Sequence, residues 1–292
     1  MRISKGEKAF YICNTAFLVL MAVVCIMPMV HIFAISLSSN TLVTKGEVFF
    51  WPKDFTLRAY EYIVSNSLFW GSFRISVVRL VLGVALQVLV TLLAAYPLSK
   101  TDARFRGRTF WAWFVFIPML FSGGVIPWYL VISRLGMTGS IWALILPCAV
   151  SPFYVLLMLN FFRGLPSEIE EAALIDGAGQ YRILFQIYLP LSLPSIATIA
   201  VYSLLGHWNS WFDGLLLMNR PQEYPLMTYL QAMVVNIDRM NLSEQEIIRI
   251  AQLGERTNRA AQVFVANVPI MIVYPIFQKY FTKGLTIGAV KG

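Results

Sequence analysis

Residues 168–194 read EIEEAALIDGAGQYRILFQIYLPLSLP and form the most polar interval between two long apolar segments. Ser167, followed three residues later by Glu170, is a capping-box pattern, and Pro166 lies just before it. A short helix is therefore expected to begin near Glu168. It can end at Gly177, because glycine adopts the left-handed conformation of a helix C-terminus without a steric penalty from Cβ.

A second short helix is expected from about Gln180 to Leu189, where Pro190 and Pro194 would end it. Together the two helices predict a helix-turn-helix that stands outside a bilayer. Both of its ends would be joined directly to membrane spans, because apolar segments flank the interval on either side.

The composition of the chain is that of a membrane protein. Of its 292 residues 58% are apolar and 13% charged, and the mean hydropathy is +0.67, whereas a soluble domain is about 45–50% apolar and about 25% charged. We therefore predict an all-α polytopic protein that forms a single domain over residues 1–292. The net charge of +8 is scattered around apolar spans, which favours contact with a lipid bilayer over nucleic acid.

Six apolar segments each come near the ~20 residues that cross a hydrocarbon core. They lie at about 9–37, 75–98, 109–131, 141–162, 195–218 and 262–281, with the polar loop at 163–194. An even number of spans places both termini and this loop on one side of the membrane. Dense basic clusters precede the first span and follow the second, at residues 2–8 and 100–108. Such clusters mark the cytoplasmic side, so we expect both termini there.

No group of residues predicts catalysis or a metal site. A Walker-type phosphate loop needs Gly-Lys followed by Ser or Thr, and the chain contains no Gly-Lys dipeptide. Glu170 and Glu171 are adjacent, hence about 100° apart on a helix, and do not converge on one atom. The three cysteines and two histidines lack the spacing of a metal or redox site. If ATP drives this protein, the ATPase is another polypeptide.

The fifth apolar segment carries a polar run, GHWNSWFD, at residues 206–213. Polar groups at membrane depth usually face a bundle interior or a water-filled path. On a continuous helix His207 and Trp211 would be one i, i+4 pair, and Asn209 and Asp213 another. Indole faces beside amide and carboxylate acceptors suit sugar rings, so these four residues and Trp208 are candidates for a substrate path. Alternatively, the tryptophans lie in an interfacial belt and Asn209 bonds a neighbouring helix.

The first helix of the polar loop has a small apolar face. Ile169, Ala172 and Ala173 recur at i, i+3 and i+4, and alanine lets the surface of another protein approach closely. Glu171 stands at the rim of this face, where it can pair with a basic group of a partner. The alternative is a hairpin that only connects two spans.

Several motifs carry a resemblance to a known family. Glu171-Ala172-Ala173, then Gly177, then Ile187-Tyr188-Leu189-Pro190, resembles the EAA loop of ABC-importer permeases. The fuller form, Glu-Ala-Ala-x-x-Asp-Gly-Ala, is similar to that of the carbohydrate-uptake, maltose-type branch. Residues 121–124, 145–147 and 208–212 agree with this branch, and the ending at 279–292 resembles that of oligosaccharide permeases of the LplC/YtcP type.

The resemblance implies a transport subunit in the bacterial cytoplasmic membrane that imports oligosaccharides by alternating access. Glu171, Ala172, Ala173, Asp176 and Gly177 would dock on ATP-binding subunits. Two such cytosolic subunits would hold ATP and Mg, with no cofactor in this chain. A second homologous permease of different sequence and an extracytoplasmic sugar-binding protein would complete the assembly. The alternative function is an ion-coupled secondary transporter, for which Asp213 is the clear candidate acid.

Overall fold

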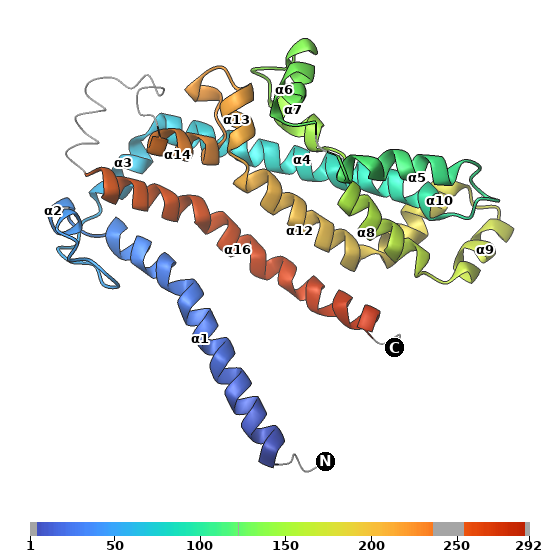
Figure 1. Cartoon of the computed structure of the whole chain (residues 1–292), viewed down its shortest axis with the longest axis horizontal. Coiled ribbons are helices and arrows are strands. Elements are labelled where there is room, and N and C mark those ends of the chain that lie inside the picture. The colour runs from blue at the N-terminus through green and yellow to red at the C-terminus, as the bar shows by residue number, and fades with distance from the viewer. Residues whose placement is uncertain (1–4, 122, 236–253, 290–292) are drawn as a thin grey trace. The chain divides into compact units, whose positions relative to one another are not determined.

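The computed structural model describes residues 5–121, 123–235 and 254–289, with only the backbone for Lys5, Val234, Val235, Tyr274 and residues 276–289. Throughout this part of the chain the regular structure is helical and contains no strand (Figure 1). An isolated antiparallel bridge pairs Ser38 with Phe55. The predicted all-α class is therefore confirmed.

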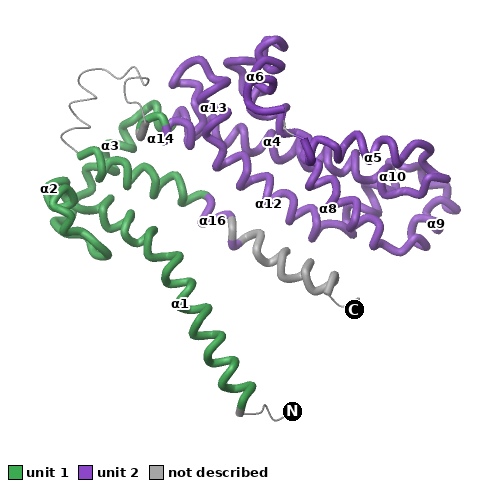
Figure 2. Tube along the Cα trace, viewed as in Figure 1, with its two compact units in different colours: residues 1–70, 232–269 green, residues 71–231, 270–292 purple. Residues whose placement is uncertain are grey.

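Contacts divide the described chain into two compact units (Figure 2). The single transmembrane domain over residues 1–292 stays a prediction. Unit 1 holds the described residues up to Trp70 and those from 232 to 269, and unit 2 holds residues 71–231 and those from 270 onward. The helices α4 (Ser67–Ser99), α14 (Leu226–Val235) and α16 (Glu255–Ala289) each contribute to both units.

Unit 1 contains α1 (Lys5–Ser36), α2 (Asn40–Thr44) and α3 (Arg58–Ser65), together with the first part of α16. A small core of Ala34, Val43 and Val48 joins α1, α2 and the loop after α2. The centroids of the Phe33 and Phe264 rings lie 4.6 Å apart. Most apolar side chains of α1 are exposed. An exposed apolar helix of this length is what a lipid-facing span requires.

Unit 2 contains the rest of α4 and a series of shorter helices. In chain order these are α5 (Arg108–Phe116), η1 (Ile117–Met119), α6 (Val125–Arg134), α7 (Ile141–Ile145), η2 (Leu146–Cys148), α8 (Pro152–Arg163), α9 (Ser167–Ile175), α10 (Gln180–Ile183), the π-helical turn η3 (Leu184–Tyr188), α11 (Leu189–Leu191), α12 (Leu193–Asn209), α13 (Phe212–Leu217), η4 (Pro221–Glu223) and the start of α14. Its main core joins buried residues of α4, α8, α9 and η3, among them Leu92, Met158, Phe162, Ala173 and Leu184.

Two helices of the described chain are long and apolar enough to cross a membrane singly, Gly6–Ser36 and Ser67–Ser99. They coincide with the first two predicted spans. The number of such spans rises to four if each of two bent pairs forms one span: Ile141–Cys148 with Pro152–Arg163, bent by 45°, and Gln180–Leu191 with Leu193–Asn209, bent by 82°. The first of these pairs covers the predicted fourth span. The total of six spans stays a prediction.

The third and fifth predicted spans are not continuous helices. In the third, α5 ends at Phe116, η1 follows with Pro118 in its first turn, and α6 begins only after Gly124, whose φ is 80°. Proline cannot donate the next helical hydrogen bond, and Gly124 combines a positive φ with an extended ψ of 177°, a conformation open essentially only to glycine, outside the helical region. In the fifth, α12 ends at Asn209 and α13 begins at Phe212.

Candidate functional site

The helix α9 begins at Ser167, within a residue of the predicted start, but without the predicted capping box. Pro166 occupies the N-cap position, with no side-chain cap hydrogen bond. Glu170 does not reach back to the helix start, because its carboxylate is bound by basic groups of the segment that follows α4 and by a phenolic group of η3. Tertiary charge pairing therefore outcompetes the local cap.

The end of α9 is as the sequence predicts. Gly177 has φ 76°, and its N–H donates to the carbonyl of Leu174 at 3.0 Å. The N–H of Ala178 donates to the carbonyl of Ala173 at 2.9 Å. This pair of hydrogen bonds around a left-handed glycine is the Schellman motif. The turn therefore needs glycine for its backbone conformation. It does not need glycine for space, because no atom lies within 4 Å of where a Cβ would stand.

The second predicted helix is present in three consecutive segments, α10, η3 and α11. The middle segment, Leu184–Tyr188, has the wider π-helical register. Pro190 lies two residues after this segment and cannot donate a hydrogen bond to the preceding turn, which fits the change of register. The expectation that Pro190 ends the helix was wrong, because Pro190 lies inside α11. Ile183, Leu184 and Tyr188 are buried and fix these segments to the core of unit 2.

A buried ion pair holds α9 against the C-terminal end of α4. The side chain of Glu170 is 5% exposed, and one of its oxygens lies 2.8 Å from Nζ of Lys100. The other lies 3.1 Å from a guanidinium nitrogen of Arg104. The hydroxyl of Tyr188 donates to the Glu170 carboxylate at 2.9 Å. One carboxylate thus ties α9, η3 and the end of α4 together.

The ammonium group of Lys100 lies over two aromatic rings. Its Nζ is 3.8 Å from the ring centroid of Tyr96 and 4.4 Å from that of Tyr188. The two rings meet edge to face at 5.2 Å, and the hydroxyl of Tyr96 donates to Oε1 of Gln180 at 2.8 Å. Cation–π attraction grows when the cation loses its water, so this cluster joins α4 to both arms of the loop.

The charges in this cluster act on each other's protonation. Burial by itself would raise the pKa of the Glu170 carboxyl, but the contacts with Lys100 and Tyr188 and the charges of Lys100 and Arg104 outweigh it and lower that pKa. Burial lowers the pKa of Lys100, and Glu170 partly offsets the effect. At neutral pH the Glu170 carboxyl is therefore ionised, as an ion pair requires.

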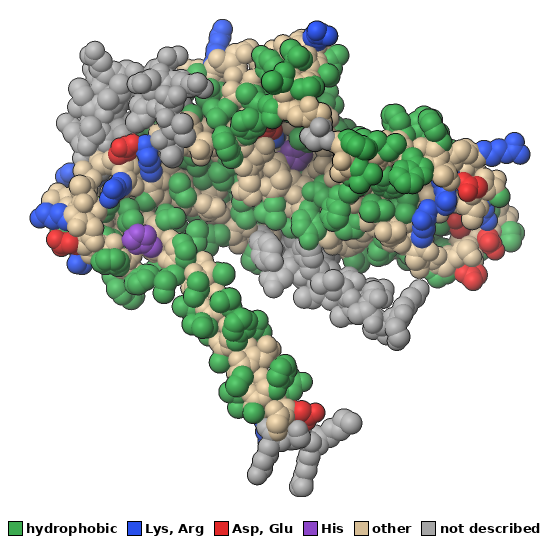
Figure 3. Space-filling view, in the orientation of Figure 1, with side chains coloured by type: hydrophobic (Ala, Val, Ile, Leu, Met, Phe, Trp, Pro, Cys, Tyr) green, Lys and Arg blue, Asp and Glu red, His purple; other side chains and the backbone are tan. Residues whose placement is uncertain are grey.

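The opposite face of α9 is open. Glu171 is 57% exposed and has only a loose contact of 3.7 Å with Arg104, and Ala172, Asp176 and Gly177 are also exposed. The predicted apolar face is divided, because Ala173 packs into the core whereas Ile169 stays on the surface. Figure 3 shows acidic and basic side chains gathered at the end of unit 2 that α9 occupies. The exposed apolar residues there include Ile175 and Tyr181, at 87% and 75%.

The polar run of the fifth apolar segment does not form the two predicted stripes. The helix ends at Asn209, and Trp211 precedes α13, so the i, i+4 geometry is lost between 209 and 213. His207 is buried against α4, and its imidazole fills the space that a Cβ at Gly83 would need. Trp208 is buried and meets the ring of Phe73 edge to face at 6.0 Å.

Asp213 is the charged centre of this region. Its carboxylate pairs with both terminal nitrogens of Arg79 on α4, whose side chain is 1% exposed. The hydroxyl of Ser210 and the N–H of Gly214 each donate to it at 2.8 Å. Sequence reasoning missed Arg79, although a single arginine inside an apolar span is a signal of an internal partner.

A large cavity adjoins Asp213. Its volume is about 1050 Å³, and its lining is mostly apolar, drawn from η1, α6, η2 and α13, with Ser210 and Asp213 as its polar groups. Trp128 and Phe212 supply aromatic faces to its wall. Asn209 and Trp211, the other predicted path residues, are exposed, with 40% of Trp211 accessible. The five predicted path residues thus divide into two packed, two exposed and one ion-paired.

Comparison with known proteins places the chain. No family model matches it. It is 38% identical over 292 residues to Protein LplC of Bacillus subtilis (strain 168), covering 100% of this chain and 98% of LplC. It is also 38% identical over 276 residues to the polygalacturonan/rhamnogalacturonan transport system permease protein YtcP of the same organism, covering 94% of this chain and 96% of YtcP. The chain belongs to the carbohydrate-uptake family of ABC-transporter permeases.

The fold of this permease matches that of a solved relative. The chain resembles one in the crystal structure of a bacterial ABC transporter involved in the import of the acidic polysaccharide alginate, with a TM-score of 0.87 and 31% identity. The match covers 96% of this permease and 99% of that chain. Such permeases are the transport components of their systems and not themselves enzymes.

Proposed function

We propose that this permease is one of two membrane subunits of an ATP-driven importer that carries oligosaccharides or related sugars into the cell by alternating access. In this assembly it spans the cytoplasmic membrane six times with both termini in the cytoplasm. Its partners are a second homologous permease of different sequence, two cytosolic ATP-binding subunits that hold ATP and Mg, and an extracytoplasmic sugar-binding protein. The permease itself holds no cofactor.

The observation that carries the coupling role is the two-faced packing of α9. Its inner face is fixed to α4 and η3 through Glu170, Lys100 and Tyr188, and its outer face presents Glu171, Ala172 and Asp176 to solvent. An ATP-binding subunit that grips the outer face moves the inner face with it. Because α4 is one helix of 33 residues, a displacement at its end is transmitted along its whole length.

The proposed path for sugar passes the cavity beside Asp213. Asn209 and Trp211 are exposed and flank Ser210, which lines the cavity. His207 and Trp208 are buried, which gives them the role of holding α12 against α4. The ion-coupled alternative needs a carboxylate that is free to bind a proton or cation. Asp213 is already engaged by Arg79, Ser210 and Gly214, which favours the ATP-driven reading.

The relatives suggest the class of sugar. YtcP is a polygalacturonan/rhamnogalacturonan permease, and AraQ of Halalkalibacterium halodurans, 29% identical over 276 residues, is an arabinooligosaccharide permease. The solved relative belongs to an alginate importer. Two of these three systems carry acidic polymers, so fragments of acidic polysaccharides are the first substrates to test.

A transport assay tests this function. Vesicles reconstituted with the permease, a partner permease, ATP-binding subunits and sugar-binding protein should take up labelled oligogalacturonate only when ATP is supplied to the ATP-binding subunits. A proton or sodium gradient without ATP should drive no uptake. Uptake by a gradient alone would overturn the proposal in favour of an ion-coupled transporter.

A further inference from the structure

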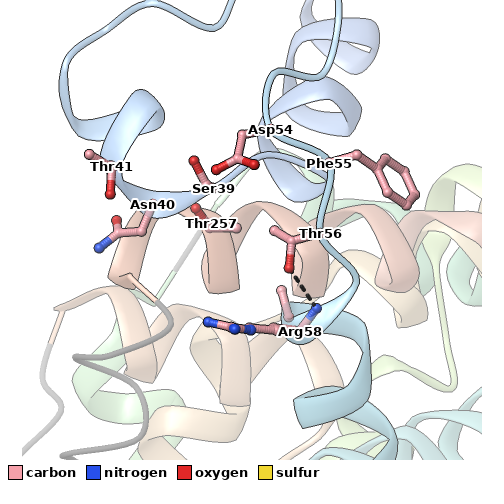
Figure 4. A pocket seen from close by; sticks show the side chains of 9 residues that line it. Ser39, Asn40, Thr41, Asp54, Phe55, Thr56, Arg58 and Thr257 are labelled. Carbon is pink, nitrogen blue, oxygen red and sulfur yellow. Dashed lines mark hydrogen bonds between the residues drawn. The ribbon is translucent and has the colours of Figure 1, made fainter.

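A polar pocket lies in unit 1 and shares no residue with the candidate site described above. It has a volume of about 420 Å³ and opens between the 39–59 segment and the first turn of α16. Its lining comprises Ser39, Asn40, Thr41, Asp54, Phe55, Thr56, Arg58, Ala59 and Thr257. Figure 4 shows the polar side chains grouped together, with the ring of Phe55 directed away from them. This volume is within the range of ligand pockets, about 300–1000 Å³.

The polar groups of this pocket have unused hydrogen-bonding capacity. Thr257 is 2% exposed, and its Oγ1 has no partner among the described residues. The same holds for the buried Oγ of Ser39. Asp54 and Arg58 both line the pocket, yet neither is in an ion pair within the described chain. Buried polar groups are nearly always bonded, so these groups favour a polar molecule as the occupant of the pocket.

Backbone hydrogen bonds hold the pocket in shape. The N–H of Ser39 donates to the carbonyl of Asp54 at 3.1 Å, and that of Thr56 to the carbonyl of Leu37 at 3.0 Å. The N–H of Arg58 donates to Oγ1 of Thr56 at 3.4 Å (Figure 4). Asp54 has φ 52°, a left-handed conformation that costs energy in a residue other than glycine. These hydrogen bonds therefore hold the pocket wall in one shape, including the unfavourable backbone conformation of Asp54.

We propose that this pocket is a second saccharide-binding subsite, which receives one sugar unit of the oligosaccharide before it enters the membrane path. The inference rests on the proposed function, which puts the 38–74 segment on the outer side. A sugar ring presents hydroxyls that both donate and accept, and the pocket offers both in turn: Asp54 accepts, Arg58 donates, and the hydroxyls of Ser39 and Thr257 do either. The guanidinium of Arg58 can also form an ion pair with the carboxylate of a uronate sugar.

Binding can be measured without transport. The permease complex in nanodiscs, with no sugar-binding protein present, is titrated with trigalacturonate by calorimetry. Thr257→Val and Arg58→Gln should each weaken binding about 2- to 10-fold, the loss of one hydrogen bond. Lys45→Gln removes an exposed positive charge of the same outer segment that does not line the pocket, and it should leave the affinity unchanged. Thr257→Val should fold normally, because its hydroxyl has no bond to lose.

The outcomes separate this inference from the proposed function. Equal trigalacturonate affinity in wild type, Thr257→Val and Arg58→Gln would overturn the subsite, even if ATP-driven uptake succeeds. A second titration measures the affinity of the same complexes for the sugar-binding protein. If the variants lose affinity for that protein while their trigalacturonate affinity is unchanged, the subsite is overturned and the pocket is a protein-docking surface. Pocket-dependent sugar binding in a complex that shows no ATP-driven uptake would leave the subsite standing while refuting the proposed importer.

Discussion

At the scale of single residues, Glu170 is a buried carboxylate on which the packing of α9 depends. It is a carboxylate on a loop that nevertheless lies buried among Lys100, Arg104 and Tyr188. Removing one member of a buried ion pair leaves the other charge without compensation, which costs more than the pair contributes. The neighbouring Glu168 is exposed and takes part in no ion pair of the described chain, and so offers a matched control.

Replacing Glu170 should destabilise the permease. Glu170→Gln strands the ammonium of Lys100 between two tyrosine rings, and the expected loss is about 3–5 kcal/mol of unfolding free energy. Thermal unfolding in nanodiscs, followed by tryptophan fluorescence, measures it, and Glu168→Gln should unfold like wild type. An unchanged midpoint for Glu170→Gln would show that this cluster contributes no stability.

The stability should also depend on acid pH through the same residue. The pKa of Glu170 is lowered in the folded protein from the ordinary value of 4.5. Its contribution is thus fully present above about pH 4.5 and is lost as pH falls through the lowered pKa. Unfolding midpoints measured from about pH 6 down to about pH 3 should fall more steeply for wild type than for Glu170→Gln. Parallel curves would contradict the lowered pKa.

The exposed face of α9 makes a separate residue-scale prediction. Glu171→Lys reverses a charge that is more than half exposed and only loosely paired. The permease should still insert and fold, but bind the ATP-binding subunits about tenfold or more weakly, the loss of roughly 1.4 kcal/mol. Co-purification of those subunits from membranes tests this, with Glu168→Lys as the control on the same helix. Normal recovery with Glu171→Lys would remove Glu171 from the docking surface.

At the scale of elements, the turn between α9 and α10 determines the direction of the outer face. Gly177 and Gly179 lie two residues apart, but only Gly177 has a positive φ. Neither position has a neighbouring atom that an added Cβ would meet. Alanine variants at these two positions therefore distinguish an effect of backbone conformation from an effect of side-chain packing.

Gly177→Ala should weaken coupling, whereas Gly179→Ala should not. A left-handed alanine costs about 1–2 kcal/mol, which favours other turns and misdirects α9. We expect sugar-stimulated ATPase activity of the reconstituted importer to fall several-fold for Gly177→Ala and to remain near wild type for Gly179→Ala. Equal activities for the two variants would mean that the Schellman turn is not needed for coupling.

At the scale of the whole molecule, unit 2 is held together by polar contacts between residues far apart in the chain. Arg79 pairs with Asp213, the hydroxyl of Ser203 donates to Gln87, and Oγ of Ser76 accepts from the N–H of Leu226 at 2.7 Å. All three contacts join α4 to later helices. The long second span is therefore the scaffold on which α12, α13 and α14 are placed.

A double-mutant cycle tests the Arg79–Asp213 link. Arg79→Gln and Asp213→Asn should each cost about 3–5 kcal/mol, because each leaves a buried charge unpaired. The double variant should lose less than the sum of the two, by a coupling energy of about 0.5–3 kcal/mol. Denaturant unfolding in nanodiscs gives the four free energies. Strict additivity would mean that the two side chains do not stabilise one another.

Much of the local structure was predictable from the sequence. The apolar segments at 9–37 and 75–98 predicted α1 and α4, since a run of ~20 apolar residues leaves the backbone no alternative to a helix in lipid. Gly177 predicted the end of α9, because the left-handed turn there needs a glycine at one position whatever the neighbouring residues are. The motif Glu171-Ala172-Ala173 with Gly177 predicted the family from residues that lie close together along the chain.

Other features depended on contacts that no local pattern encodes. Hydropathy predicted one continuous span across each of the breaks after Phe116 and Asn209. The first break has local causes in Pro118 and Gly124, whereas the second falls where the helices pack around Asp213. A sequence does not indicate which cation a carboxylate will meet: Glu170 was read as a cap and Asp213 as a path residue. Only the tertiary structure showed that Glu170 pairs with Lys100 and Asp213 with Arg79. A buried charge is costly unless an opposite charge lies within a few ångströms, and the packing of the helices decides which one does.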